Sequence, residues 1–265
     1  MNTIISFSGG RTSGMMLKTM IDNYGGCLPD HVKVCFANTG KEHPATLEFV
    51  RKCADFFNCE IVWLEWKNAE RAADRWQIVD FQTAARNGEP FSKLIDLRKY
   101  VPNPVTRFCT QELKIRPMKY YARQALGWDE WQVAIGLRAD EPQRVAKLKN
   151  RREIFEKFAP LAEKGITKTD VAAFWESQLF DLDLPNVNGI TAHGNCDLCF
   201  LKGINKRTAL IEENPGLADW WAWQETKTGT AFCKNLPDYQ TLKTIAANQR
   251  KLFEQDDIQD CFCTD

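Results

Sequence analysis

Two groups of residues in this sequence have types and spacings suited to chemistry. The first is Ser8-Gly9-Gly10-Arg11-Thr12-Ser13, a run of glycines and hydroxyl-bearing residues. The second is Cys196-Asp197-Leu198-Cys199, in which two residues separate the thiols, together with Cys109 much earlier in the chain. We expect the first group to bind an anion and the second to bind a metal or exchange electrons.

The anion site depends on the elements that flank the glycines. Thr3–Phe7 is apolar and β-branched, as in a strand, and Gly14–Tyr24 has the periodicity of a helix. A strand that runs directly into a helix directs free backbone amides and the positive helix end at one point. The two glycines let a phosphate approach the backbone, and the hydroxyls of the run can donate hydrogen bonds to it. A tight turn with a Ser or Thr cap is the structural alternative.

The spacing of Cys196 and Cys199 supports three interpretations. Both sulfurs can reach one metal ion or cluster, and the spacing does not separate zinc from an iron–sulfur cluster. A redox dithiol is the third interpretation. Ten cysteines are many for a reducing compartment, where clustered thiols more often indicate metal binding or catalysis than disulfides. Four cysteines lie in or beside apolar patterns and are predicted to be core residues: Cys27, Cys35, Cys53 and Cys59.

The balance of charged side chains limits which binding partners the chain can attract. The 35 basic and 35 acidic side chains cancel, so no overall field draws the chain to nucleic acid or to an anionic membrane. A nucleic-acid contact would be local, and the basic run Arg144–Arg152 is its best candidate, with a solvated helix face as the alternative. Because the amino-terminal residues hold no leader and no apolar run of membrane-spanning length, we expect a cytoplasmic protein.

The order of elements predicts an α/β fold. Val32–Phe36, Glu60–Leu64 and Trp131–Leu137 are further strand candidates, and Pro44–Phe57 and Ile115–Leu126 are helix candidates between them. Strands separated by helices imply a mostly parallel twisted sheet with helices on both faces. Ligands of such sheets bind at the carboxyl ends of the strands.

We expect two units along the chain. Residues 1–183 form the α/β nucleotide-binding domain, and residues 184–265 form a cysteine-containing, mainly helical region that binds the metal or cluster. Trp66–Thr106 holds several prolines and has weak periodicity, which favours an insertion or mobile loop. The helix candidates of the second unit are Ile204–Glu213, Gly216–Thr226 and Leu242–Phe253.

The first run resembles the pyrophosphatase loop (PP-loop) of the adenine nucleotide alpha hydrolases, which reads SGGxDS. The chain looks most like the phosphoadenosine phosphosulfate (PAPS) reductase branch and its phage and bacterial relatives, which implies a Rossmann-like fold. Phe36–Glu42 resembles the second-strand motif, Gly136–Arg144 the GxRxxExxxR loop, and Arg107–Pro117 the cysteine motif C-x-x-x-L-K-x-x-P. The resemblance covers about residues 1–203.

The resemblance implies a set of site residues. The nucleotide ligands would be Ser8, Gly9, Gly10, Arg11, Thr12, Ser13, Asn38, Thr39 and Gly40. The groups acting on the reactive end of the substrate would be Arg138, Glu141, Arg144 and the terminal Cys263. The cluster ligands would be Cys109, Cys196, Cys199 and Cys261, with Cys233, Cys263 or no fourth protein ligand as alternatives.

The sequence departs from the family pattern at two positions. Thr12 stands where the pyrophosphatase loop has Asp, which bears on how ATP and Mg²⁺ would be handled. Thr110 stands where cluster-bearing reductases have a second cysteine, so one cluster ligand is missing from the motif.

The resemblance implies a PAPS reductase-like enzyme that binds PAPS, adenosine phosphosulfate (APS) or ATP and uses a [4Fe-4S] cluster for sulfonucleotide reduction, with a thioredoxin-type reductant. One alternative is ATP-dependent adenylation followed by sulfur transfer to tRNA, DNA or a small molecule. A second is a non-catalytic nucleotide-binding protein with structural zinc. The sulfur acceptor, a nucleic-acid substrate and homo-oligomer formation stay open.

Overall fold

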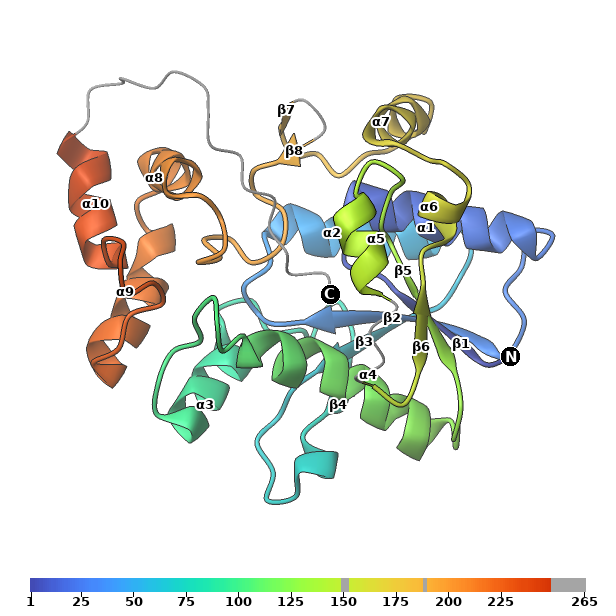
Figure 1. Ribbon diagram of the computed structural model, residues 1–265, viewed down its shortest axis with the longest axis horizontal. Coiled ribbons are helices and arrows are strands. Elements are labelled where there is room, and N and C mark those ends of the chain that lie inside the picture. Colours follow the sequence, from blue (N-terminus) through green and yellow to red (C-terminus); the bar gives the residue numbers. More distant parts are fainter. Residues whose placement is uncertain (149–152, 188–189, 249–265) are drawn as a thin grey trace.

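A computed structural model describes residues 1–148, 153–187 and 190–248 of the chain, and its centre is a six-stranded sheet (Figure 1). The strand order is β4-β3-β2-β1-β5-β6, and all neighbours are parallel except β3 and β4. The predicted α/β class with a mostly parallel sheet is therefore confirmed. The strands are β1 (Thr3–Ser6), β2 (Val32–Asn38), β3 (Ile61–Glu65), β4 (Gln77–Val79), β5 (Gln132–Ile135) and β6 (Glu156–Phe158).

Helices cover both faces of the sheet because neighbouring side chains of each strand point in opposite directions. Ile5 packs in a core with apolar side chains of α1, α2 and α7, while Ile4 packs in a separate core with Tyr121 and Ala122. On the first face lie α1 (Arg11–Asn23), α2 (Pro44–Phe56), α6 (Pro160–Glu163) and α7 (Lys168–Glu176) (Figure 1). On the opposite face lies a helical run formed by η2 (Thr110–Ile115), α4 (Arg116–Tyr120) and η3 (Tyr121–Ala125).

A third core lies beside the sheet. Phe91, Leu94 and Ile95 of α3 pack there with Trp221 and Tyr239, which belong to the last helices of the described chain. These elements are α3 (Glu89–Arg98), α8 (Ile204–Glu213), α9 (Leu217–Thr228) and α10 (Tyr239–Asn248), grouped together in Figure 1. The region predicted to bind the metal thus shares its core with a helix from the first 183 residues. The division at residue 183 stays a prediction.

The prediction of an insertion or mobile loop over Trp66–Thr106 missed three elements: the short helix at Ala72–Asp74, β4 and α3. The prolines that suggested a loop are compatible with the helix, because Pro90 stands in the first turn of α3, where no backbone donor is needed. The predicted strands and helices elsewhere agree with the structure within a few residues, except that the end predicted for the last helix lies outside the described residues.

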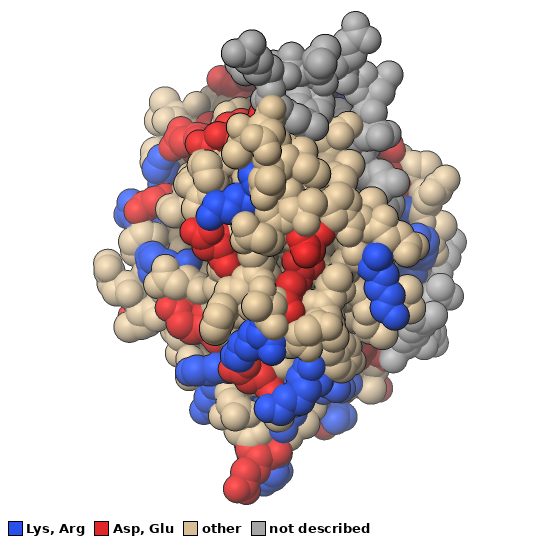
Figure 2. Space-filling model, turned by 90° about the vertical axis from the view of Figure 1, so that its left-hand side faces the viewer, with Lys and Arg blue, Asp and Glu red and all other residues tan. Residues whose placement is uncertain are grey.

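The remaining elements are short: η1 (Ala72–Asp74), α5 (Pro142–Lys147), β7 (Asn186–Val187) and β8 (Ile190–Thr191). Basic and acidic side chains are interspersed over the face that Figure 2 presents, in keeping with a net charge of zero. No helix within the described ranges is both long and apolar enough to cross a membrane.

Candidate nucleotide and thiol site

The phosphate loop, Ser8–Ser13, joins β1 to α1 at the carboxyl edge of the sheet. Gly9 has φ +77°, and a Cβ there would lie 2.6 Å from Thr46 Cγ2, so this position requires glycine. The hydroxyl of Ser13 accepts hydrogen bonds from the amides of Ser8 and Gly10, both at 3.2 Å, and donates to the Gly10 carbonyl at 2.9 Å. These hydrogen bonds of Ser13 therefore stabilise the conformation of the loop.

Arg11 anchors the loop to a distant part of the chain. Its guanidinium donates from Nε to Asp181 Oδ1 at 2.7 Å, from Nη1 to Thr191 Oγ1 at 2.9 Å and from Nη2 to the Leu184 carbonyl at 2.8 Å. Partial burial opposes the ionisation of Asp181, but the hydrogen bonds and charge of Arg11 outweigh it and lower the pKa of that carboxyl. Arg11 thus fixes the wall of the cavity beside the loop.

That cavity, the phosphate-loop cavity, has a volume of about 400 Å³, which is within the range of small-ligand sites. The whole predicted loop lines it, and so do Arg138 and Glu141 from the loop after β5 and Arg144 from α5. Lys168 and Lys206 line it as well. With these cations and the positive end of α1 beside them, the cavity is suited to a phosphorylated anion.

The arginines of this cavity are held by Glu141. Its Oε2 accepts the Arg138 amide at 3.0 Å, and its Oε1 accepts a hydrogen bond from Arg144 Nη1. Arg138 also donates from Nη1 to Thr12 Oγ1 at 3.4 Å, so the residue in place of the family's Asp contacts an arginine. The structure thus brings these predicted residues together with the phosphate loop.

Asn38, Thr39 and Gly40 lie elsewhere. Asn38 is fully buried and donates to Glu65 Oε1 at 2.6 Å, and the Gly40 amide donates to Asn38 Oδ1 at 3.2 Å. The amide and hydroxyl of Thr39 donate to the Glu42 carboxylate at 2.9 and 2.8 Å. None of the three lines the phosphate-loop cavity, so their role as nucleotide ligands stays a prediction.

Cys109, Cys196 and Cys199 line one small cavity, the thiol cavity, together with Thr39 and Lys114. Burial raises the pKa of Cys109 and raises that of Cys196 to about 12, and the charge of Lys114 opposes both shifts. Lys114 therefore favours the thiolate form that metals bind.

Thiolates are ligands of both zinc and iron–sulfur clusters, and three thiols line this cavity. Across the described ranges, no three His, Cys, Asp or Glu side chains are gathered around one metal-ion position. An iron–sulfur cluster needs thiolates that bind separate irons around a shared space, and the thiol cavity has three thiols in its lining. Cys233 does not line the thiol cavity, and its thiol lies 3.6 Å from the Phe200 carbonyl oxygen. Cys261 and Cys263 lie outside the described residues.

A third, mainly apolar pocket of about 80 Å³, the central pocket, lies between the two cavities. Ser8, Gly136 and Asn195 line both the central pocket and the phosphate-loop cavity. Thr110 and Lys114 line both the central pocket and the thiol cavity. The phosphate loop and the three thiols therefore face adjoining spaces.

Sequence reasoning missed two cations of the site. Lys168 follows Thr167, whose side chain and that of Asp170 form a capping box at the start of α7. The T-x-x-D pattern was a readable sign of a helix start. Lys206 is in α8, and no local pattern connects it to the phosphate loop.

Much of the chain matches one known protein family. Residues 2–178 match the phosphoadenosine phosphosulfate reductase domain family. An uncharacterized nin region protein, ORF290, of Escherichia phage lambda is 32% identical over 224 residues, which cover 82% of this chain and 72% of that protein.

Two solved structures are similar at lower identity. PAPS reductase from Candida auris, in a phosphate complex, has a TM-score of 0.40 and 18% identity, covering 66% of this chain and 72% of that one. The U34-tRNA thiolase NcsA from Methanococcus maripaludis, with its [4Fe-4S] cluster, has a TM-score of 0.41 and 15% identity. The match covers 94% of this chain and 73% of that one. From the family match and the phage relative, we conclude that the chain belongs to the phosphoadenosine phosphosulfate reductase domain family.

Proposed function

We propose that this chain is a PAPS reductase-like enzyme that binds an adenine nucleotide and reduces a sulfonucleotide with the help of a cysteine-ligated [4Fe-4S] cluster. The observation that carries the proposal is the shared lining of three adjoining spaces, from the phosphate loop through the central pocket to Cys109, Cys196 and Cys199. A nucleotide held at the phosphate loop would have its reactive phosphorus or sulfur within this connected space.

The chain's own groups would position the substrate. The backbone amides at the start of α1 and the guanidinium groups of Arg138 and Arg144 would bind its anionic end, and Glu141 would keep both arginines in place. Cys109, Cys196 and Cys199 would hold the cluster, which when bound would supply a concentrated charge beside the substrate. Lys114 would stabilise negative charge on Cys109 and Cys196, because its charge opposes the rise in pKa that burial causes in both thiols.

In the reduction, a cysteine thiolate attacks the sulfur of the phosphosulfate. The bond between that sulfur and the bridging oxygen breaks, its electron pair stays with AMP or its 3′-phosphorylated form, and an S-sulfonated cysteine results. A thioredoxin-type dithiol then releases sulfite and becomes a disulfide. Cys263 is the predicted nucleophile and lies outside the described residues.

A second candidate reaction is ATP-dependent sulfur transfer. The phosphate-loop cavity is lined by Arg138, Arg144, Lys168 and Lys206, a cation set large enough for a triphosphate. Cleavage between the α and β phosphates would release pyrophosphate and adenylate an oxygen of the acceptor. A sulfide-level sulfur from the cluster would then attack the carbon that bears this oxygen, and the carbon–oxygen bond would break as AMP leaves with the oxygen. Mg²⁺ accompanying ATP would meet two carboxylates in the cavity lining, Asp140 and Glu141, both paired with arginines.

The test begins with anaerobic purification and analysis of iron, acid-labile sulfide and zinc in the same sample. About four irons and four sulfides per chain are expected. Incubation with PAPS plus a thioredoxin-type reductant should then release sulfite, whereas pyrophosphate release from ATP would favour sulfur transfer. If the sample instead contains one zinc per chain and no sulfide, and releases neither sulfite nor pyrophosphate, the proposal is wrong. The chain would then be a non-catalytic nucleotide-binding protein.

A further inference from the structure

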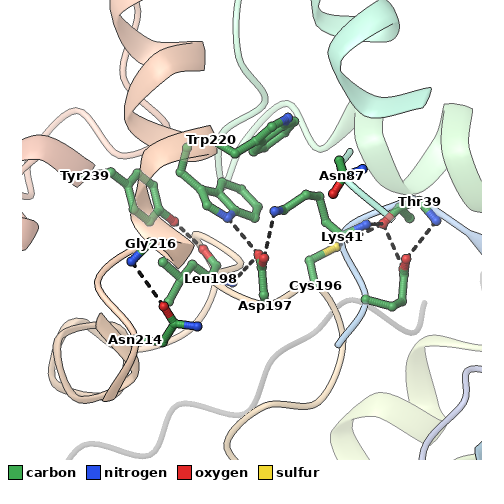
Figure 3. Close-up of polar contacts among 12 residues, drawn as sticks. Thr39, Lys41, Asn87, Cys196, Asp197, Leu198, Asn214, Gly216, Trp220 and Tyr239 are labelled. Atoms are coloured by element: carbon green, nitrogen blue, oxygen red, sulfur yellow. Dashed lines mark hydrogen bonds and ion pairs between the residues drawn. The ribbon is translucent and has the colours of Figure 1, made fainter. Parts of the chain in front are cut away.

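The segment Thr39–Glu42, which follows β2, contacts the loop that begins at Cys196 (Figure 3). Lys41 Nζ lies 2.8 Å from Asp197 Oδ2, and each of these side chains is only 9% exposed. The Asp197 amide donates to the Lys41 carbonyl at 2.7 Å, and Glu42 forms an antiparallel bridge with Cys196. Backbone and side-chain contacts thus join Lys41 and Glu42 to Cys196 and Asp197.

Asp197 also connects this loop to α9. Its Oδ1 accepts hydrogen bonds from the Leu198 amide at 2.7 Å and from Trp221 Nε1 at 2.8 Å, and Trp221 is fully buried. The ammonium group of Lys41 lies 5.1 Å from the ring centroid of Trp220. The segment after β2, the cysteine loop and α9 therefore meet at the carboxylate of Asp197, which lies between Cys196 and Cys199 in the sequence.

A buried ion pair is a weak source of stability, because desolvation of both charges offsets their attraction. Such a pair does fix geometry, since either charge left alone in the interior is strongly unfavourable. Neither Lys41 nor Asp197 lines the phosphate-loop cavity, the central pocket or the thiol cavity. Their effect on a ligand would therefore pass through the residues that they hold.

We propose that Lys41 and Asp197 are positioning residues that present Cys196 and Cys199 toward Cys109. Cys196 Sγ lies 3.5 Å from Thr39 Oγ1, and Thr39 lines the thiol cavity. The segment Thr39–Glu42, whose first two residues are predicted nucleotide ligands, therefore contacts the cysteine loop. The inference rests on the proposed metal site at the three thiols. It predicts that a change at Lys41 or Asp197 affects metal binding at these thiols without affecting nucleotide binding at the phosphate loop.

The experiment compares Lys41→Met and Asp197→Asn with the native chain. Lys41→Met keeps the aliphatic stem and removes the charge, and Asp197→Asn keeps a side-chain oxygen for Leu198 and Trp221. Lys227→Met is the matched control, because it breaks an ion pair with Asp96 whose side chains are 36% and 46% exposed.

The alkylation rates of Cys196 and Cys199 in metal-free native protein are measured by peptide mass spectrometry, with buried Cys35 as internal reference. Metal content and ATP binding are measured on the same preparations.

Both charge-removing variants should alkylate Cys196 and Cys199 about tenfold faster, because loss of the buried pair lets the loop open locally. They should also lose most of the bound metal while ATP affinity stays within about twofold, since the phosphate loop is untouched. Lys41→Arg, which keeps the charge, should restore slow alkylation, and Lys227→Met should resemble the native chain.

The double variant Lys41→Met/Asp197→Asn separates positioning from stability. It leaves no unpaired buried charge, so its thermal stability should recover relative to the single variants while the loop thiols stay reactive. It also supplies the comparison if a single variant fails to fold. Native alkylation rates and metal content in a folded charge-removing variant would overturn the inference. Failure of the nucleotide proposal would appear separately, as ATP binding that is insensitive to changes in the phosphate loop.

Discussion

At the scale of single residues, neighbouring glycines of the phosphate loop have different roles. Gly9 needs its left-handed backbone, and a Cβ there would clash with Thr46 at 2.6 Å. Gly10 has φ −104°, and a Cβ there would meet only Ser8 Oγ, at 3.8 Å. A side chain at Gly10 is therefore compatible with the fold and would instead occupy the phosphate-loop cavity.

Gly10→Val should accordingly weaken adenine nucleotide binding at least about tenfold with a stability change within about 1 kcal/mol, because the branched side chain blocks close approach of a phosphate. Gly9→Val should lower the free energy of unfolding by about 2–4 kcal/mol through backbone strain and overpacking. Calorimetric titration with ATP and PAPS, together with urea unfolding, checks both. Native-like nucleotide affinity in Gly10→Val would contradict the assignment of the loop.

The buried core cysteines make stability depend on pH. Burial raises the pKa of Cys35 and Cys53 far above the ordinary thiol value of about 8.5, so these thiols stay protonated in the folded chain. In the unfolded chain they ionise above that pH, so the folded state binds more protons there. Their contribution to stability is complete below the unfolded pKa and is lost as pH rises toward the folded pKa.

We therefore expect the free energy of unfolding to fall by about 2–3 kcal/mol from these two thiols between pH 7.5 and pH 9.5. Urea unfolding under anaerobic, reducing conditions measures the change. The double variant Cys35→Ala/Cys53→Ala should show a smaller dependence on pH, and an unchanged slope in that variant would assign the effect to other groups.

At the scale of elements, the packing of α7 on α1 determines where the phosphate loop sits. Trp175 of α7 donates from Nε1 to the Arg11 carbonyl at 2.8 Å, at the start of α1. Its ring covers Gly14, where a Cβ would lie 2.5 Å from Trp175 Cζ2. Gly14 is thus a contact point between helices, and its lack of a side chain brings α7 and Lys168 to the cavity.

Gly14→Ala should lower the free energy of unfolding by about 1–2 kcal/mol, because overpacking against Trp175 exceeds the gain in helix propensity. The displaced α7 should also reduce nucleotide affinity. Urea unfolding and ATP titration measure both effects, with Lys18→Ala on the outer side of α1 as control. A more stable Gly14→Ala chain would show that α7 adjusts freely.

At the scale of the whole molecule, the thiol cavity exists only because two distant segments meet. Cys109 precedes η2 on one face of the sheet, while Cys196 and Cys199 belong to the loop before α8. The third core, which contains α3 and the last helices, holds these segments together. Metal binding at this cavity is therefore expected to depend on all three thiols.

Alanine substitution of Cys109, Cys196 or Cys199 should remove most of the iron and sulfide, whereas Cys233→Ala should retain them, because Cys233 does not line the thiol cavity. Anaerobic metal analysis with absorption spectra measures this, and circular dichroism controls for folding. Loss of iron in Cys233→Ala alone would identify Cys233 as a ligand instead.

The sequence by itself was sufficient for the features that depend on neighbouring residues. The phosphate loop, four strands of the sheet and the C-x-x-C pair follow from local periodicity and spacing, and the glycines between a strand and a helix predict an anion site. Arg138, Glu141 and Arg144 were placed by the order of motifs, because loops at the carboxyl ends of parallel strands meet at one edge.

Only the tertiary structure decided which distant residues meet. Lys206 faces the phosphate loop, and Lys41 pairs with Asp197, although no pattern along the chain connects either lysine to its surroundings. Asn38, Thr39 and Gly40 do not line the phosphate-loop cavity. The Asn38 side chain is bonded to Glu65 instead, and the Gly40 amide is bonded to Asn38. Local patterns encode secondary structure, whereas long-range pairs depend on the packing of all three cores at once.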